Sequence, residues 1–233
     1  MRDVKRCQPW NALTWLRASR SRKGLTAAVD PALHRRALSL SYFTVGYNVV
    51  EGLVSILAGA LAGSIALVGF GLDSFVESLS GGVMIWRFRL HGRVSEKEEE
   101  RVEGRATRLV GYTFLILGSY VLYESGSKLL RHEMPEPSLF GMLIAVVSLI
   151  VMPGLALAKH RTGQAISSRS LMADSKETVA CAWLSLALLV GLGLNYLLGL
   201  WWADPLAGLL IVVFLFREGY ETLTEEECEQ DGL

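Results

Sequence analysis

The chain contains 233 residues, 51% of them hydrophobic, and its formal net charge is zero. This length and composition fit either one large soluble domain or a small membrane bundle, and the distribution of the apolar residues decides between the two. A disulfide framework is excluded, because there are three cysteines and two of them, Cys7 and Cys228, lie in predicted cytoplasmic tails, where thiols stay reduced.

Apolar runs recur along the chain with short breaks, and a run of about 20 residues is long enough to cross a bilayer as a helix. We therefore predict an all-α membrane protein, a bundle of six transmembrane helices. The last run is short, but Asp204 as an N-cap and Arg217 as a snorkelling side chain extend it. The predicted spans are Ala37–Ala62, Ile65–Phe88, Leu109–Leu130, Leu139–Ala158, Leu171–Leu198 and Pro205–Phe216.

Lys and Arg are concentrated in alternate connections between the predicted spans. They are frequent before the first span, after the second span and after the fourth span, where the connection begins at Lys159. The connections at residues 63–64 and 199–203 contain neither residue type. By the positive-inside rule, this pattern places both termini in the cytoplasm.

Two tails flank the predicted transmembrane domain, residues 37–217. Residues 1–36 are basic and form either a short amphipathic helix on anionic lipid or a disordered segment, without a structured nucleic-acid-binding motif. No cleavable secretory signal precedes Arg36, so the first span is the expected insertion signal. Residues 218–233 form an acidic tail that is too short for a folded soluble domain.

The first span contains two polar residues, Asn48 and Glu51. A glutamate in hydrocarbon is energetically unfavourable, so we expect Glu51 to face the interior of the bundle. Glu51 is either a proton-binding or vestibule group, or a structural group paired with a polar neighbour.

The second span contains two acidic residues, Asp73 and Glu77, within an otherwise apolar run. Residues four apart leave the same face of a helix, one turn above the other. Two carboxylates in hydrocarbon repel each other and lose their hydration unless a cation or protons lie between them. The pair predicts half of a divalent metal site, and the alternative is a pair of lumen-lining or helix-capping acids without a ligand.

The fifth span carries Asp174, Glu177 and Cys181 at positions i, i+3 and i+7, which form one stripe along a helix. Glu177 and Cys181 repeat the one-turn spacing of Asp73 and Glu77. The two spans run in opposite directions, and each pair lies about ten residues inside its span, so both pairs approach the middle of the bilayer. A metal cage of four ligands between the two helices is therefore geometrically plausible.

Two residues of this stripe have alternative interpretations. Cys181 is either a metal ligand or a small buried hydrophobic residue. Asp174 lies nearer the cytoplasmic end, where it is either a ligand that the ion meets first or a residue of the helix start. When a metal ion leaves such a site, carboxylates that lie side by side cannot all stay ionised, so we expect protons to replace it.

The order of these motifs resembles the cation diffusion facilitator family of divalent-metal transporters, over roughly residues 37–222. The sequence Gly63-Ser-Ile-Ala-Leu, followed by Asp73 and Glu77, resembles the second helix of that family. In that helix a pair with His or Asp at its first position and Asp at its second binds metal.

Two further stretches carry the resemblance. The sequence Ser170-Leu-Met-Ala-Asp, followed by Glu177 and Cys181, is similar to the fifth helix of the family, where the ligand pair is usually His and Asp. The sequence Trp201–Leu210, together with Arg217–Tyr220, is similar to the sixth helix and its exit.

The resemblance implies a multi-pass protein of the cytoplasmic membrane, a homodimer, and metal efflux in exchange for protons by alternating access. It implies no cofactor and no enzymatic activity; the transported ion is zinc, with Mn²⁺, Fe²⁺ or Co²⁺ as alternatives. No histidine occupies either ligand pair, and Cys181 replaces a carboxylate. Oxygen-rich sites suit Mn²⁺, Fe²⁺ or Co²⁺, whereas a thiolate favours the softer Zn²⁺. We also expect this chain to lack the family's usual cytoplasmic metal-sensing domain.

Two rival functions belong to other classes. A non-transporting membrane subunit would bind metal only to stabilise or modulate a partner, and it predicts stoichiometric binding without flux. A metal-dependent intramembrane enzyme is disfavoured, because the sequence has no histidine pair of the usual hydrolase spacing.

Overall fold

The computed structural model describes residues 31–90, 96–133, 135–136, 138–166 and 168–231, and this part of the chain is all-helical, without a strand. The prediction of an all-α protein is confirmed, whereas the alternatives for residues 1–30 lie outside the described residues. The described helices are α2 (Pro31–Ala62), α3 (Ile65–Leu90), α4 (Glu96–Arg131), α5 (Leu139–Ala165), α6 (Arg169–Leu198) and α7 (Ala203–Asp231).

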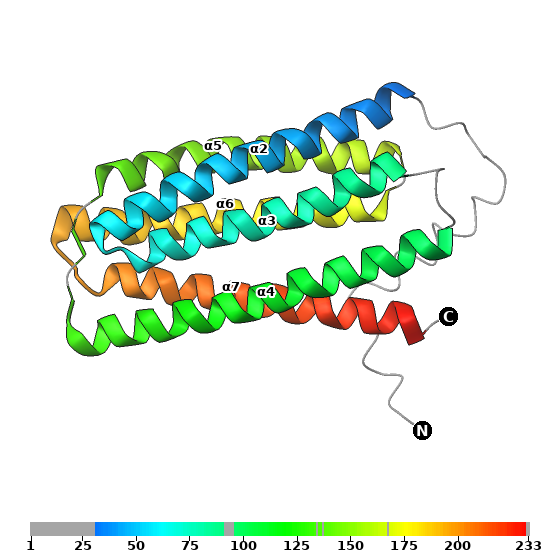
Figure 1. The fold of residues 1–233 in the computed structure, drawn as a ribbon. Coiled ribbons are helices and arrows are strands. Elements are labelled where there is room, and N and C mark those ends of the chain that lie inside the picture. Colours follow the sequence, from blue (N-terminus) through cyan, green and yellow to red (C-terminus); the bar gives the residue numbers. More distant parts are fainter. Residues whose placement is uncertain (1–30, 91–95, 134, 137, 167, 232–233) are drawn as a thin grey trace, which may run out of the picture.

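The helices form an elongated bundle in which successive helices run in opposite directions (Figure 1). Helix α2 packs along α3, α5 along α6, and α4 along α7. The start of α2 and the end of α7 lie at the same end of the bundle (Figure 1). Apolar side chains from several helices fill the interior, and the large ones among them include Leu67, Phe70, Met152, Leu188 and Ile211.

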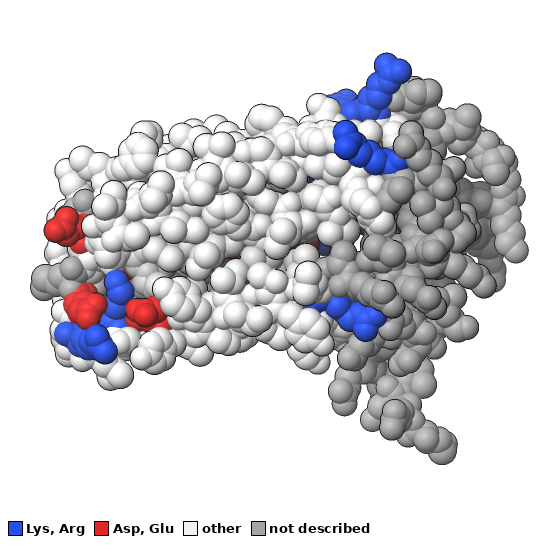
Figure 2. All heavy atoms as spheres, in the orientation of Figure 1, with Lys and Arg blue, Asp and Glu red and all other residues white. Residues whose placement is uncertain are grey.

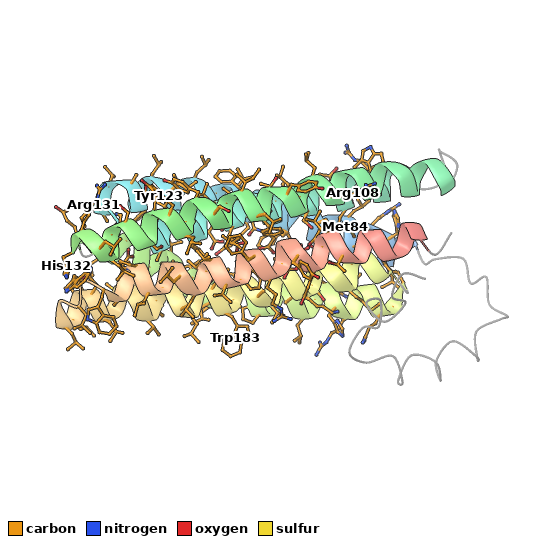
Figure 3. All side chains as sticks on the ribbon, turned by 90° about the horizontal axis from the view of Figure 1, so that it is seen from below. Met84, Arg108, Tyr123, Arg131, His132 and Trp183 are labelled. Atoms are coloured by element: carbon orange, nitrogen blue, oxygen red, sulfur yellow. The ribbon has the colours of Figure 1, made fainter. Side chains whose placement is uncertain are left out.

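The outer surface of the bundle is apolar along its middle. Figure 2 shows that the Lys, Arg, Asp and Glu side chains visible on one face gather at the two ends. Trp183 of α6 is 67% exposed and projects away from the bundle (Figure 3), and Leu57, Ile116, Ile150 and Val213 are also exposed. An apolar surface of this extent is unfavourable in water and suits contact with lipid.

Among the residues that the structure describes, three stretches are long and apolar enough to cross a membrane: residues 32–62 of α2, the whole of α5, and residues 174–198 of α6. Helices α3, α4 and α7 are also longer than the roughly 20 residues that a span needs. They carry more charge, because α3 contains two central acids, α4 begins with a charged segment and α7 ends with an acidic one. Length and hydropathy together support three spans, so the prediction that all six helices cross the membrane stays a prediction.

Two glycines bring the backbones of α2 and α3 into contact. A Cβ atom added to Gly71 would lie 2.8 Å from the backbone oxygen of Gly52, and one added to Gly52 would lie 2.9 Å from that of Gly71. Small residues at a helix crossing permit this close approach in membranes. The contact fixes the position of α3, which carries Asp73 and Glu77 just beyond it.

The start of α3 is fixed by a residue of α7. Asp204 is fully buried, and its Oδ2 accepts a hydrogen bond from the backbone N–H of Ile65 at 3.0 Å. Its Oδ1 accepts a second one from the hydroxyl of Ser64. The sequence predicted that Asp204 caps its own helix, but α7 already begins at Ala203, so the carboxylate caps α3 instead.

Candidate metal site between α3, α5 and α6

Two acidic residues of α3 face the interior of the bundle. Asp73 is 4% exposed and Glu77 is 3% exposed, as their one-turn spacing predicts for residues on a single buried face. Asp73 and Glu77 lie one turn apart on the same face of α3.

A lysine of α5 reaches into the same region. Lys159 is fully buried, and its Nζ lies 2.9 Å from Oδ2 of Asp174 on α6. The same ammonium donates a hydrogen bond to Oγ1 of Thr178 at 2.8 Å and lies 4.0 Å from Oε1 of Glu77. One cation therefore contacts or approaches polar groups on two other helices.

Thr178 connects the lysine to α3. Its hydroxyl accepts the hydrogen bond from Lys159 and donates one to Oε1 of Glu77 at 2.9 Å. The carbonyl oxygen of Asp174 is an alternative acceptor for that hydroxyl, at 3.1 Å. The hydroxyl thus links the charge on α5 to the carboxylate on α3 through a residue of α6.

The position of Lys159 corrects the sequence interpretation, which assigned this residue to a cytoplasmic connection. Helix α5 continues to Ala165, and its buried face recurs at helical spacing through Met152, Leu155, Lys159 and Thr162. Side chains in a helix point toward its N-terminus, so Lys159 is directed from the end of α5 toward the middle of the bundle. Lys159 lies on this buried face, one turn beyond Leu155, and is therefore internal.

The predicted residues of α6 lie opposite α3. Glu177 is partly buried, and its Oε2 accepts a hydrogen bond from the hydroxyl of Ser80 on α3 at 2.8 Å. Cys181 is a buried free thiol beside the carboxylate of Glu77. The facing arrangement of the two antiparallel helices is therefore present, with Ser80, Thr178 and Lys159 as polar partners that the sequence analysis did not identify.

The five predicted ligands do not form a ready metal cage. Among the described residues, no group of three His, Cys, Asp or Glu side chains is close enough together to hold a metal ion. Asp174 pairs instead with Lys159, Glu177 with Ser80, and Glu77 with Thr178. Which of these residues bind an ion therefore stays a prediction.

Two carboxylate oxygens in this region keep free acceptor capacity. Oε2 of Glu77 and Oδ1 of Asp174 are buried, and neither has a hydrogen-bond partner within the described part of the protein. Buried carboxylate oxygens are normally satisfied by donors or by a cation. The two atoms therefore mark the place where an additional positive group would be stabilised.

Glu51 of α2 lies in a separate polar contact. It is buried, its Oε1 accepts a hydrogen bond from the hydroxyl of Tyr47 at 3.1 Å, and its Oε2 accepts one from Ser74 at 3.0 Å. The predicted pairing with polar neighbours is therefore present. The alternative role in proton binding stays untested.

Comparison with known proteins identifies the family. A model described as the cation efflux transmembrane domain matches residues 42–226. The chain is 21% identical to transmembrane protein 163 of Xenopus laevis over 192 residues, covering 82% of this chain and 67% of that protein. It is 25% identical over 189 residues to the cation-efflux pump FieF of Shewanella oneidensis, covering 76% and 64% of the two chains.

A mycobacterial relative gives a similar result. The chain is 28% identical to the probable cation efflux system protein MT2084 of Mycobacterium tuberculosis over 191 residues, covering 79% of this chain and 57% of that one. The chain thus spans about two thirds or less of the length of these relatives.

The matched region contains all of α3, α5 and α6 and therefore every residue of the candidate site. Together with its apolar helices, this match shows an integral membrane protein. The chain belongs to the cation efflux family, the cation diffusion facilitators.

Proposed function

We propose that this protein transports a divalent metal cation across the membrane, with zinc as the first candidate, and that it expels the ion from the cytoplasm in exchange for protons. The family supports cation efflux as the class of function. The observation that carries the proposal is the pair of buried carboxylate oxygens, on Glu77 and Asp174, that have no hydrogen-bond partner in the described structure at the meeting of α3 and α6.

The proposed ligands are Asp73 and Glu77 on α3 and Glu177 and Cys181 on α6, with Asp174 as a ligand nearer the cytoplasm. Carboxylate oxygens and a thiolate together satisfy the tetrahedral preference of Zn²⁺, whereas the carboxylates alone suit Mn²⁺, Fe²⁺ or Co²⁺. The transported ion is the substrate of the protein, and no separate cofactor is proposed.

Ion binding requires a small rearrangement of α3 against α6. The contacts that hold the present arrangement include the hydrogen bonds from Ser80 to Glu177 and from Thr178 to Glu77. A hydrogen bond of this kind contributes about 0.5–1.5 kcal/mol net, so binding of a divalent ion can replace both. Rocking of the helices around the site, which opens it to either side in turn, then gives alternating access.

The proposed topology has six spans with both termini in the cytoplasm. Three of the helices, α2, α5 and α6, carry stretches long and apolar enough to span, and the packing of α3 along α2 and of α7 against α6 supports the proposal that the other three cross the same layer. Figure 2 supports this topology, because the visible middle of the bundle is almost free of charged side chains. The family resemblance supports a homodimer in the cytoplasmic membrane.

Flux measurements on the reconstituted full chain test the proposal. Proteoliposomes are loaded with Zn²⁺, Mn²⁺, Fe²⁺ or Co²⁺ in turn, and ion movement is followed under an imposed pH gradient. We expect flux of Zn²⁺ in the wild type and its loss in Glu77→Gln. The control is Glu133→Gln, an exposed residue next to Arg131 at one end of the bundle. Zinc binding without flux of any of the four ions would instead support the non-transporting subunit.

A further inference from the structure

The ammonium of Lys159 is fully buried beside the proposed metal ligands, and the proposed transport cycle gives it no role. Its Nζ lies 2.9 Å from Asp174 and 4.0 Å from Glu77, which are the two residues with unpartnered carboxylate oxygens. A positive charge thus already neutralises part of the acidic region in which the metal ion is proposed to bind.

We propose that Lys159 is a tethered competitor of the transported cation: its ammonium occupies the acidic region when metal is absent and moves away when metal binds. This inference rests on the proposed function and adds to it the residue that sets the affinity of the site. The lysine and the metal ion are alternative partners of the same carboxylates, because both are cations.

The contacts of Lys159 explain why its departure would complete the site. While the ammonium holds Asp174 directly and Glu77 through Thr178, each carboxylate has one oxygen engaged. Release of the ammonium frees Oδ2 of Asp174 for an ion and leaves the hydroxyl of Thr178 free to turn from Glu77 to its alternative acceptor, the carbonyl oxygen of Asp174. It also removes the repulsion between a monovalent and a divalent cation in a region where water screens charges weakly.

The proposed movement is a retraction of the Lys159 side chain toward the nearby end of α5. Lys159 lies close to the end of α5 at Ala165, and the lysine stem is a flexible chain of four carbons. A lysine near the end of a membrane helix can direct its ammonium to the adjacent interface. Retraction toward that end breaks the contacts of the ammonium with Asp174 and Thr178.

The test measures zinc affinity of the purified full chain in detergent by calorimetric titration. Lys159→Gln keeps a hydrogen-bond donor but removes the charge, and we expect it to bind Zn²⁺ at least ten times more tightly than the wild type. Lys159→Arg retains the charge and should show no such gain. Lys128→Gln is the matched control, because Lys128 bonds the carbonyl of Gly63 at the other end of the bundle. Unchanged or weaker binding by folded Lys159→Gln would overturn the proposal.

A second comparison covers the case in which Lys159→Gln does not fold. The double variant Lys159→Gln/Asp174→Asn removes both members of the buried ion pair, and it is compared with Asp174→Asn alone, where the ammonium remains. The proposal requires at least tenfold tighter zinc binding by the double variant, and equal or weaker binding contradicts it.

A labelling arm measures the movement directly. The proposal requires that Zn²⁺ increase the reaction of Lys159 with an amine-directed reagent, as determined by mass spectrometry. Labelling that does not change with Zn²⁺ contradicts retraction. If Asp73→Ala abolishes zinc binding but no substitution of Lys159 changes the zinc affinity, this inference alone is refuted. If the wild-type protein neither binds nor transports zinc, the proposed transport is refuted.

Discussion

Nζ of Lys159 lies 2.9 Å from Oδ2 of Asp174, and both side chains are buried where α5 and α6 meet. Removing one member of a buried ion pair leaves the other charge without compensation, at a cost of about 3–5 kcal/mol. We therefore expect Lys159→Met to lower the free energy of unfolding by about that amount in metal-free protein, and Lys159→Met/Asp174→Leu to recover most of the loss.

Thermal or denaturant unfolding in detergent measures this difference. The control is Arg217→Ala, which breaks the pair between Arg217 and Glu221, also 2.9 Å long but exposed. Exposed ion pairs contribute little to stability, so this control should unfold like the wild type. Equal effects of Lys159→Met and Arg217→Ala would show that burial does not strengthen the internal pair.

The cap that Asp204 provides to α3 gives a second prediction. Its carboxylate accepts hydrogen bonds from Ser64 and from the backbone of Ile65, so Asp204→Ala leaves two buried donors at the start of α3 without an acceptor. Loss of an N-cap costs about 0.5–2 kcal/mol, and we expect unfolding at a correspondingly lower temperature. Asp204→Asn retains one acceptor oxygen and should lose less. An Asp204→Ala protein as stable as the wild type would argue against the capping role.

The crossing of α2 and α3 gives a third prediction, which compares Gly71 at the crossing with Gly82 farther along α3. Gly71→Ala places a Cβ atom 2.8 Å from the backbone oxygen of Gly52, so the helices must separate. Overpacking of this kind costs about 1–3 kcal/mol, and it also displaces the acids of α3. Gly82→Ala is the control, because a Cβ atom there meets no atom within 4 Å. The prediction fails if the two variants unfold at the same temperature and transport zinc equally.

The thiol of Cys181 gives a prediction about ion selectivity. If Cys181 is a ligand, Cys181→Ser replaces a soft donor with a hard one, and zinc flux should fall at least tenfold relative to manganese flux. Cys181→Asp should shift the preference further toward Mn²⁺ and Co²⁺. If Cys181 is only a small buried hydrophobic residue, Cys181→Ser changes both fluxes by the same factor. Parallel flux assays with the two ions distinguish these outcomes.

The sequence predicted the features that depend on local periodicity. The spacing of Asp73 and Glu77 placed both on one buried face, and the second span was predicted to begin at Ile65, where α3 begins. The stripe of Asp174, Glu177 and Cys181 was placed opposite α3, and contacts of Glu177 with Ser80 and of Cys181 with Glu77 are present.

The features that depend on contacts between distant helices could not be predicted from single segments. Lys159 was assigned to the cytoplasm, because hydropathy counts its charge without the partner that Asp174 provides from another helix. Asp204 was assigned to its own helix, because nothing near it in the sequence indicates that it reaches Ser64. Pairing across a bundle becomes visible only in three dimensions.

Zinc flux through Asp73→Ala and Glu177→Ala, in proteoliposomes under a pH gradient, measures most directly whether the facing acids of α3 and α6 share one transported ion. We predict that either substitution reduces the flux at least tenfold while the protein remains folded. Flux equal to that of the wild type in both variants would contradict the account.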